Sequence, residues 1–185
     1  MELSAYSIEN GVLAYWYRLV PEAIIPEGVT KIGQTAFARC ESLLSVIIPC
    51  SVMKIGCNAF IDCSSLKEIR YDGTKKQWET VEKENSWYEN TRIQKVFCSD
   101  GTVELPAYSI EDGVLTRWYR LIPKVIIPEG VTKIDNFAFE NSISLKEIHY
   151  DGTKEQWEAV KKEPEWNDGV PIEYIVCTDG TVKLQ

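Results

Sequence analysis

The feature of this sequence that most constrains its fold is a short internal repeat. Ile24 and the apolar positions after it recur from Ile47 onwards, so the period is 23 (47 minus 24). The matched positions are Ile24, Ile25, Pro26, Val29, Ile32, Gly33, Ala36, Phe37, Cys40 and Leu43, then Ile47, Ile48, Pro49, Val52, Ile55, Gly56, Ala59, Phe60, Cys63 and Leu66. A unit this short cannot bury an apolar face alone, so its copies must stack as successive turns of a coil.

A longer repeat duplicates most of the chain. The segment Ile24–Ile32 returns unchanged as Ile126–Ile134, at an offset of 102 (126 minus 24). Further along, Tyr71 and the residues after it return from Tyr150, at an offset of only 79 (150 minus 71). The two offsets differ by 23 (102 minus 79), which is one short repeat. The second half therefore resembles the first with one copy missing.

This duplication predicts two units. We expect the first to span 1–106 with two short repeats and the second to span 107–185 with one, meeting near Leu105-Pro106. One continuous solenoid is the alternative. Two units are favoured because the segment from Tyr71 to Leu105 carries signals for a helix and a hairpin, which would interrupt a continuous stack.

Local signals predict the elements that open each unit and build each repeat. Asn10-Gly11 and Asp112-Gly113 favour tight turns and predict a β-hairpin at the start of each unit. Within the repeat, Val46 and Ile48 share one face of an extended segment, and Pro49 ends it because proline has no N–H to donate. We expect one short strand per repeat, followed by a turn or a short helical arm that folds back on it.

Each unit is expected to close on a helix and a second hairpin. Thr74 followed by Gln77 is a capping-box pattern that begins a helix, and the second half repeats it from Thr153. The turn Ser99-Asp100-Gly101 then predicts a hairpin, which also has its counterpart in the second half. The tryptophans of the closing segments are expected to be structural: Trp78, Trp87, Trp157 and Trp166.

The short repeat resembles a known family. Read as Leu-x-x-Val-x-Ile-Pro-x-x-Val-x-x-Ile-Gly-x-x-Ala-Phe-x-x-Cys, it is similar to the BspA-type leucine-rich repeats of bacterial and protist proteins. The opening segment Ile8–Leu13 and the closing Gly-Thr-x-x-Gln-Trp also resemble common flanks in that family, so the resemblance covers nearly the whole chain. The third copy departs from the pattern at Asp135, Phe137 and Ser142 without changing its spacing.

The resemblance implies both a fold and a role. The fold class is α/β and β-rich: a right-handed leucine-rich-repeat solenoid with a short parallel sheet, β-hairpin caps at its opening and helix-plus-hairpin caps at its close. The implied role is a non-catalytic protein–protein interaction module, of a family typically found at cell surfaces and binding host or matrix proteins. The resemblance brings no catalytic residues with it.

Composition narrows the classes of function. Lys and Arg number 20 against 28 Asp and Glu, and the net charge of -8 repels nucleic acid and anionic membrane surfaces. His149 is the single histidine, so mechanisms that need several imidazoles are disfavoured. No glycine-rich phosphate loop or nucleophile elbow occurs. We expect no enzyme, no cofactor, no metal site and no membrane span.

The cysteines bear on the cellular compartment in which the protein resides. Of the six cysteines, Cys40 and Cys63 occupy equivalent positions, as do Cys98 and Cys177, which predicts stacked buried thiols. A structural disulfide or zinc site is the alternative. The start Met1–Ser4 lacks the basic and apolar regions of an export signal, and free thiols suit reducing conditions. The chain as written thus reads as cytoplasmic, whereas the resemblance suggests a surface or secreted protein if the chain is a fragment.

The outer face of the parallel sheet is the candidate binding site, because solenoids bind partners along the surface that stacking creates. Strand alternation places five residues on it: Ile24, Ile47, Arg70, Ile126 and His149. Repeated isoleucines with a polar rim are typical of a protein-binding strip. The alternative is that a cap, the other half or a second copy covers them.

Aromatic clusters offer a competing site. Tyr15-Trp16-Tyr17 and Trp118-Tyr119 present flat rings on which a sugar could stack, which favours a carbohydrate- or cell-wall-binding module. Packing at the ends of the solenoid explains the same residues and is the preferred interpretation, because those ends must be sealed. A structural spacer or self-associating subunit is a third interpretation of the chain.

Overall fold

The structure is a computed structural model that describes residues 6–17, 20–119, 121–140 and 142–184. Met1–Ser4, on which the expectation about an export signal depends, lie outside the described residues. The chain divides into two compact units, residues 1–106 (unit 1) and 107–185 (unit 2). No helix of the described residues is long and apolar enough to cross a membrane.

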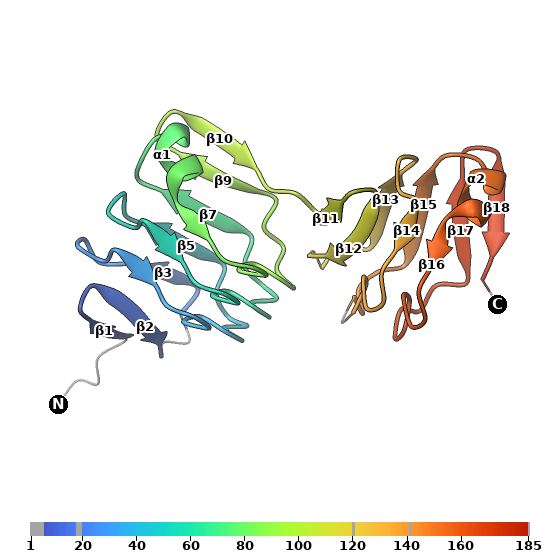
Figure 1. Ribbon diagram of the computed structural model, residues 1–185. Helices are drawn as coiled ribbons and strands as arrows, with labels where there is room; N and C mark the ends of the chain where they lie inside the picture. The colour runs from blue at the N-terminus through green and yellow to red at the C-terminus, as the bar shows by residue number, and fades with distance from the viewer. Residues whose placement is uncertain (1–5, 18–19, 120, 141, 185) are drawn as a thin grey trace. The chain divides into compact units, whose positions relative to one another are not determined.

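In unit 1 the chain alternates between two five-stranded sheets (Figure 1). The back sheet has the order β1-β2-β4-β6-β8 and the front sheet the order β10-β9-β7-β5-β3. The back strands are β1 (Tyr6–Glu9), β2 (Val12–Trp16), β4 (Lys31–Ile32), β6 (Lys54–Ile55) and β8 (Glu82–Lys83). The front strands are β3 (Glu22–Ile24), β5 (Ser45–Ile48), β7 (Glu68–Tyr71), β9 (Lys95–Cys98) and β10 (Gly101–Glu104).

Unit 2 repeats this plan with one turn fewer. Its back sheet has the order β11-β12-β14-β16 and its front sheet the order β13-β15-β17-β18. The back strands are β11 (Tyr108–Glu111), β12 (Val114–Trp118), β14 (Lys133–Ile134) and β16 (Lys161–Lys162). The front strands are β13 (Lys124–Pro128), β15 (Glu147–Asp151), β17 (Tyr174–Cys177) and β18 (Gly180–Lys183).

Repeat-equivalent residues lie on neighbouring parallel strands. Ile48 of β5 pairs with Tyr71 of β7, which lies one repeat period later in the chain. On the other side, the Ile25 N–H donates to the carbonyl of Ile47 over 3.0 Å. The inward residues Val46 and Ile48 are fully buried. The predicted solenoid with a short parallel sheet is confirmed.

The expectation of one strand per repeat is wrong, and of the two alternatives expected after that strand, a turn or a short helical arm, the structure has the turn. After the front strands β3, β5 and β13 the chain forms a short back strand, β4, β6 or β14, and then consecutive turns, not a helix. Helical N–H groups bond within their own segment, whereas Thr35, Phe37 and Arg39 donate to the next coil over 2.8–3.1 Å. Thr35 and Arg39 also have φ of 55° and 60°, which a right-handed helix does not allow. The coil-to-coil bonds satisfy backbone groups that a helix would have satisfied internally.

A ladder of aromatic rings fills the core of each unit. In unit 1 Trp16 stacks on Phe37 at 5.3 Å between ring centroids and Phe37 stacks on Phe60 at 4.8 Å. Trp87 and Phe60 form a T-shaped pair with their centroids 6.2 Å apart. Unit 2 has the same order with Trp118, Phe139 and Trp166. The repeat phenylalanines are thus covered by a tryptophan from the opening cap at one end and from the closing segment at the other. All four tryptophans expected to be structural are buried.

The hairpin and helix caps are present in both units. β1 and β2 form an antiparallel hairpin, and β2 then runs parallel to β4 as the first strand of the stack. Helices α1 (Lys75–Thr80) and α2 (Lys154–Ala159) begin after Thr74 and Thr153, each with the complete capping box that the sequence predicts. The closing segment is itself an enlarged coil. Ile69 of β7 pairs in parallel with Val96 of β9, which lies further along the chain than one repeat period would reach.

A lysine fixes the end of the closing helix. Lys83 donates from Nζ to the carbonyls of Trp78 and Val81 at 2.6 and 2.7 Å, and its ammonium lies 4.5 Å from the centre of a Trp78 ring. Burial lowers the pKa of Lys83. Lys162 takes the same position over Trp157 in unit 2. These cations occupy the C-terminal end of a helix, where the helix dipole favours positive charge.

Candidate binding surface

The register of the front sheets brings the predicted site residues into rows. In unit 1 Ile24, Ile47 and Arg70 are directly paired across β3, β5 and β7. In unit 2 Ile126 pairs with His149 across β13 and β15. Side chains alternate along a strand, so residues between these point into the core, as the fully buried Val46 and Ile69 do. In each unit we call these outward residues, together with the residue paired with the last of them on the following strand, the outward row.

The outward row is accessible within each unit. Ile24 and Ile126 are 57% and 55% exposed, and Arg70 is also exposed, while Ile47 and His149 are half-buried. The caps of their own units therefore do not cover them. Within each unit, a large apolar side chain exposed on the front sheet is the kind of surface feature that protein partners use.

Two members of the outward row were missed from the sequence. Phe97 pairs with Arg70 across β7 and β9, and Val176 pairs with His149 across β15 and β17. Phe97 is 37% exposed. From the sequence the closing hairpin is expected to be a cap, so its first strand is not aligned there with the parallel sheet. The alternation of Val96, Phe97 and Cys98 was the available signal, because it matches that of Ile69, Arg70 and Tyr71.

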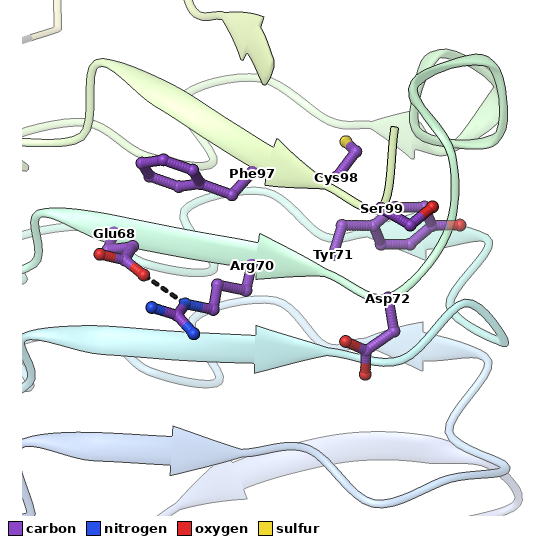
Figure 2. Close-up of a pocket in the computed structure, with 7 residues that line it drawn as sticks. All are labelled: Glu68, Arg70, Tyr71, Asp72, Phe97, Cys98 and Ser99. Atoms are coloured by element: carbon purple, nitrogen blue, oxygen red, sulfur yellow. Dashed lines mark hydrogen bonds and ion pairs between the residues drawn. The ribbon is translucent and has the colours of Figure 1, made fainter. Parts of the chain in front are cut away.

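Each outward row contains a cationic or titratable side chain that contacts a glutamate earlier on its own strand. Arg70 Nε donates to Glu68 Oε1, as the dashed line in Figure 2 marks. This hydrogen bond raises the pKa of the Arg70 guanidinium. In unit 2 His149 Nε2 lies 3.0 Å from Glu147 Oε2. Alternate residues of a strand share a face, so the pairs lie on the outward surface.

A shallow depression lies beside this pair in both units. In unit 1 it has a volume of about 340 Å³ between β7, which supplies Arg70 and leads into Asp72, and β9, which supplies Phe97 and leads into Ser99 (Figure 2). In unit 2 it has about 160 Å³ and lies at the equivalent place. The lining residues there are Ile126, His149, Tyr150, Asp151, Val176, Cys177 and Thr178.

The aromatic clusters are divided between core and surface. Trp118 is buried, and Trp16 is half-buried between Tyr6 and Phe37. Tyr119 is half-buried. Tyr15 and Tyr17 are 54% and 63% exposed and stack on each other at 6.2 Å. A sugar-stacking platform would therefore consist of these two tyrosines, with the tryptophans supporting the cap.

The six cysteines are free thiols in the structure. Cys63 is buried and donates to the Phe37 carbonyl over 2.9 Å, and its neighbour in the stack, Cys40, is half-buried. Their mutual hydrogen bond lowers the pKa of Cys40 and raises that of Cys63. Cys177 is buried, whereas its counterpart Cys98 is half-buried. Among the residues that the structure describes, no cluster of three or more His, Cys, Asp and Glu side chains could hold a metal ion.

Comparison with known proteins gives a family match. The family model described as "BspA type Leucine rich repeat region" matches six copies within residues 7–146 and 117–159. A search of curated proteins finds no match.

Three solved structures are similar to this chain. A leucine rich cell surface protein from Faecalibacterium prausnitzii is 27% identical, with 84% of this chain and 40% of that one covered and a TM-score of 0.33. A leucine-rich repeat protein from Eubacterium ventriosum is 17% identical, with coverages of 76% and 37% and a TM-score of 0.42. A T. pallidum leucine rich repeat protein is 19% identical, with coverages of 78% and 67% and a TM-score of 0.33. The chain thus spans 40% and 37% of the lengths of the first two proteins.

Proposed function

Because this chain belongs to the BspA-type leucine-rich repeat family, we propose that it is a non-catalytic module that binds a protein partner on the outward rows of its front sheets. The observation that carries the proposal is the equivalent exposure of Ile24 and Ile126, at 57% and 55%, on the two front sheets. A flat strip of apolar side chains with a charged rim suits a protein surface better than a small molecule.

The rim of the strip supports this role. Glu22, Ser45 and Glu68 pair across β3, β5 and β7 on the same face as the outward row. In unit 2 Lys124 and Glu147 take the corresponding place. Polar groups around an apolar centre fix the orientation of a partner while the centre supplies the buried area.

A finer proposal concerns the kind of partner. The family association favours adhesion at a cell surface, with a host or matrix protein as the partner. This part depends on the family association alone, and binding assays against a panel of purified matrix proteins test it.

The outward row itself is tested by the double substitution Ile47→Asp and Ile126→Asp. Placing a carboxylate at the centre of the strip leaves a charge to be desolvated on binding, so we expect partner affinity to fall about tenfold or more. The measurement is surface plasmon resonance against the protein that the panel identifies. Ile143→Asp is the matched control, because Ile143 is 76% exposed and lies in a turn outside the strands of the front sheet. Unchanged affinity in the double variant, with circular dichroism confirming its fold, would place the binding site elsewhere.

A second candidate function is carbohydrate binding at the opening cap of unit 1. The stacked and exposed pair Tyr15–Tyr17 favours it. A glycan array with the intact chain and with Tyr15→Ala/Tyr17→Ala separates the two functions. Glycan binding that requires these tyrosines, without any protein partner, would replace the first proposal.

A further inference from the structure

The depression in unit 1 contains a carboxylate that is not matched by a cation. Glu68, Arg70 and Asp72 are its charged lining residues. Glu68 is paired with Arg70, so Asp72 is left over. The Asp72 side chain is exposed, and it forms no hydrogen bond or ion pair with any residue in the described part of the chain. The pocket therefore has one net negative charge.

Unit 2 has the same arrangement with different neighbours. Asp151 lines the second depression at the position equivalent to Asp72, at an offset of 79 (151 minus 72). Its side chain is likewise exposed and unpaired within residues 6–17, 20–119, 121–140 and 142–184. The imidazole of His149 contacts Glu147 and is not a partner of Asp151. Both depressions thus offer a free carboxylate at the same edge of the front sheet.

Each depression also has at least one apolar side chain in its lining. In unit 1 Phe97, 37% exposed, lines the depression from the strand next to Arg70 (Figure 2). In unit 2 Ile126 and Val176 line the pocket. A side chain with an apolar stem and a cationic end fits this combination, because its methylene groups cover apolar surface while its charge stays at the carboxylate. Lysine and arginine are the side chains with that character.

We propose that each depression binds a lysine or arginine side chain presented by the protein partner. The stem lies against Phe97 in unit 1 and against Val176 in unit 2, and the cationic end pairs with Asp72 or Asp151. The net charge of -8 on this chain favours a basic partner surface and speeds its approach. This inference rests on the proposed function and names the chemistry by which the outward rows recognise their partner.

The test uses the full chain labelled with ¹⁵N and a titration followed by NMR. The probes are the blocked residues Nα-acetyl-arginine N-methylamide and Nα-acetyl-lysine N-methylamide, with Nα-acetyl-norleucine N-methylamide as the probe that lacks the charge. We expect the cationic probes to shift the amide signals of Asp72 and Ser99 in unit 1, and of Asp151 and Thr178 in unit 2. The norleucine probe is expected to leave them in place, and added salt should weaken the cationic probes.

Two variants serve as controls for each other. Asp72→Asn should weaken binding in unit 1 about threefold, within the range for a partly exposed ion pair, and leave unit 2 unchanged. Asp151→Asn should do the reverse. Glu41→Gln removes the same charge at an exposed turn position that lines neither depression, and we expect it to change neither affinity.

Three results would overturn the inference. The first is an equal shift by norleucine and arginine, which would make the depressions purely apolar. The second is a stronger shift with Nα-acetyl-glutamate N-methylamide, which would assign Arg70 to an anionic partner. The third is the absence of shifts at both depressions. In any of these cases the Ile47→Asp/Ile126→Asp variant still tests the outward row separately. Loss of partner binding in that variant would support the outward row as the binding site, and only the cation-binding pockets would be refuted.

Discussion

Replacing Phe60 by alanine is expected to lower the free energy of unfolding of unit 1 by about 3–5 kcal/mol, the cost of removing a fully buried aromatic side chain. Phe60 has no exposed surface and stacks on Phe37 at 4.8 Å between ring centroids. On its other side it meets Trp87 at 6.2 Å. The substitution therefore interrupts the aromatic ladder at its centre, where coils on both sides prevent the cavity from closing.

Urea unfolding followed by far-ultraviolet circular dichroism measures the size of this effect, and hydrogen exchange resolved by peptide shows where it occurs. Relative to the parent chain, we expect hydrogen exchange to accelerate more in β5 and β7 than in β13 and β15, because the ring contacts of Phe60 lie within unit 1. Phe139→Ala should reverse the pattern, since Phe139 occupies the equivalent place in unit 2.

Phe137→Ala is the matched control for both substitutions. It removes the same ring from a side chain that is 39% exposed, so we expect a change below about 1 kcal/mol. A loss at Phe60 no greater than at Phe137 would show that the ladder does not stabilise the stack.

The architecture of the molecule was readable from the sequence because stacking requires equal spacing. Residues separated by one repeat period, such as Ile48 and Tyr71, must lie over each other if each period is one coil. The capping box at Thr74 was equally readable, because its chemistry is complete within the first turn of the helix. Elements that are set by residues close in the chain, or by the repeat period, were therefore predictable from the sequence.

Features that depend on contacts between coils were not readable. The turns after β4 resemble a short helical arm in sequence, since apolar residues are closely spaced in both cases, but their N–H groups bond to the next coil. The place of Phe97 in the outward row was hidden because the closing coil, which brings Val96 beside Ile69, is longer than the repeat. Lys83 reads as a solvated charge, and its contact with Trp78 becomes visible only when the helix end is placed.

The candidate site was therefore predictable in part. Alternation along β5 and β7 predicts Ile47 and Arg70 on the outward face, and the register of these strands pairs the two residues. The depressions could not be foreseen, because each depends on two strands separated by a helix and on the size of the side chains between them. The unmatched charge of Asp72 is also a property of the folded chain, since it depends on Arg70 being paired with Glu68.

Replacing Gly56 by alanine is the second substitution with a large expected effect, a loss of about 1–3 kcal/mol of folding stability from overpacking. An added Cβ would lie 2.7 Å from the backbone nitrogen of Gln34 and 2.8 Å from the carbonyl carbon of Gly33. Gly56 is outside the left-handed region, so the cost comes from the contact and not from its backbone angles. Because both contacted atoms belong to the backbone of the previous coil, relief requires the two coils to separate, and the Gly56 N–H bond to Ile32 opposes this.

Two further alanine variants make the comparison specific. Gly130→Ala adds a methyl group with nothing within 4 Å, and we expect its midpoint in thermal unfolding to stay close to that of the parent chain. The unfolding midpoint of Gly33→Ala should lie between those of Gly56→Ala and Gly130→Ala. Asp135 occupies the position equivalent to Gly33 in unit 2 and still donates its N–H to the carbonyl of Leu115 over 3.0 Å. An opening cap can therefore accommodate a Cβ at this point, whereas Gly56 packs against a full repeat coil. Equal midpoints for Gly56→Ala and Gly130→Ala would mean that the coils are not held at the backbone spacing on which the stacked core depends.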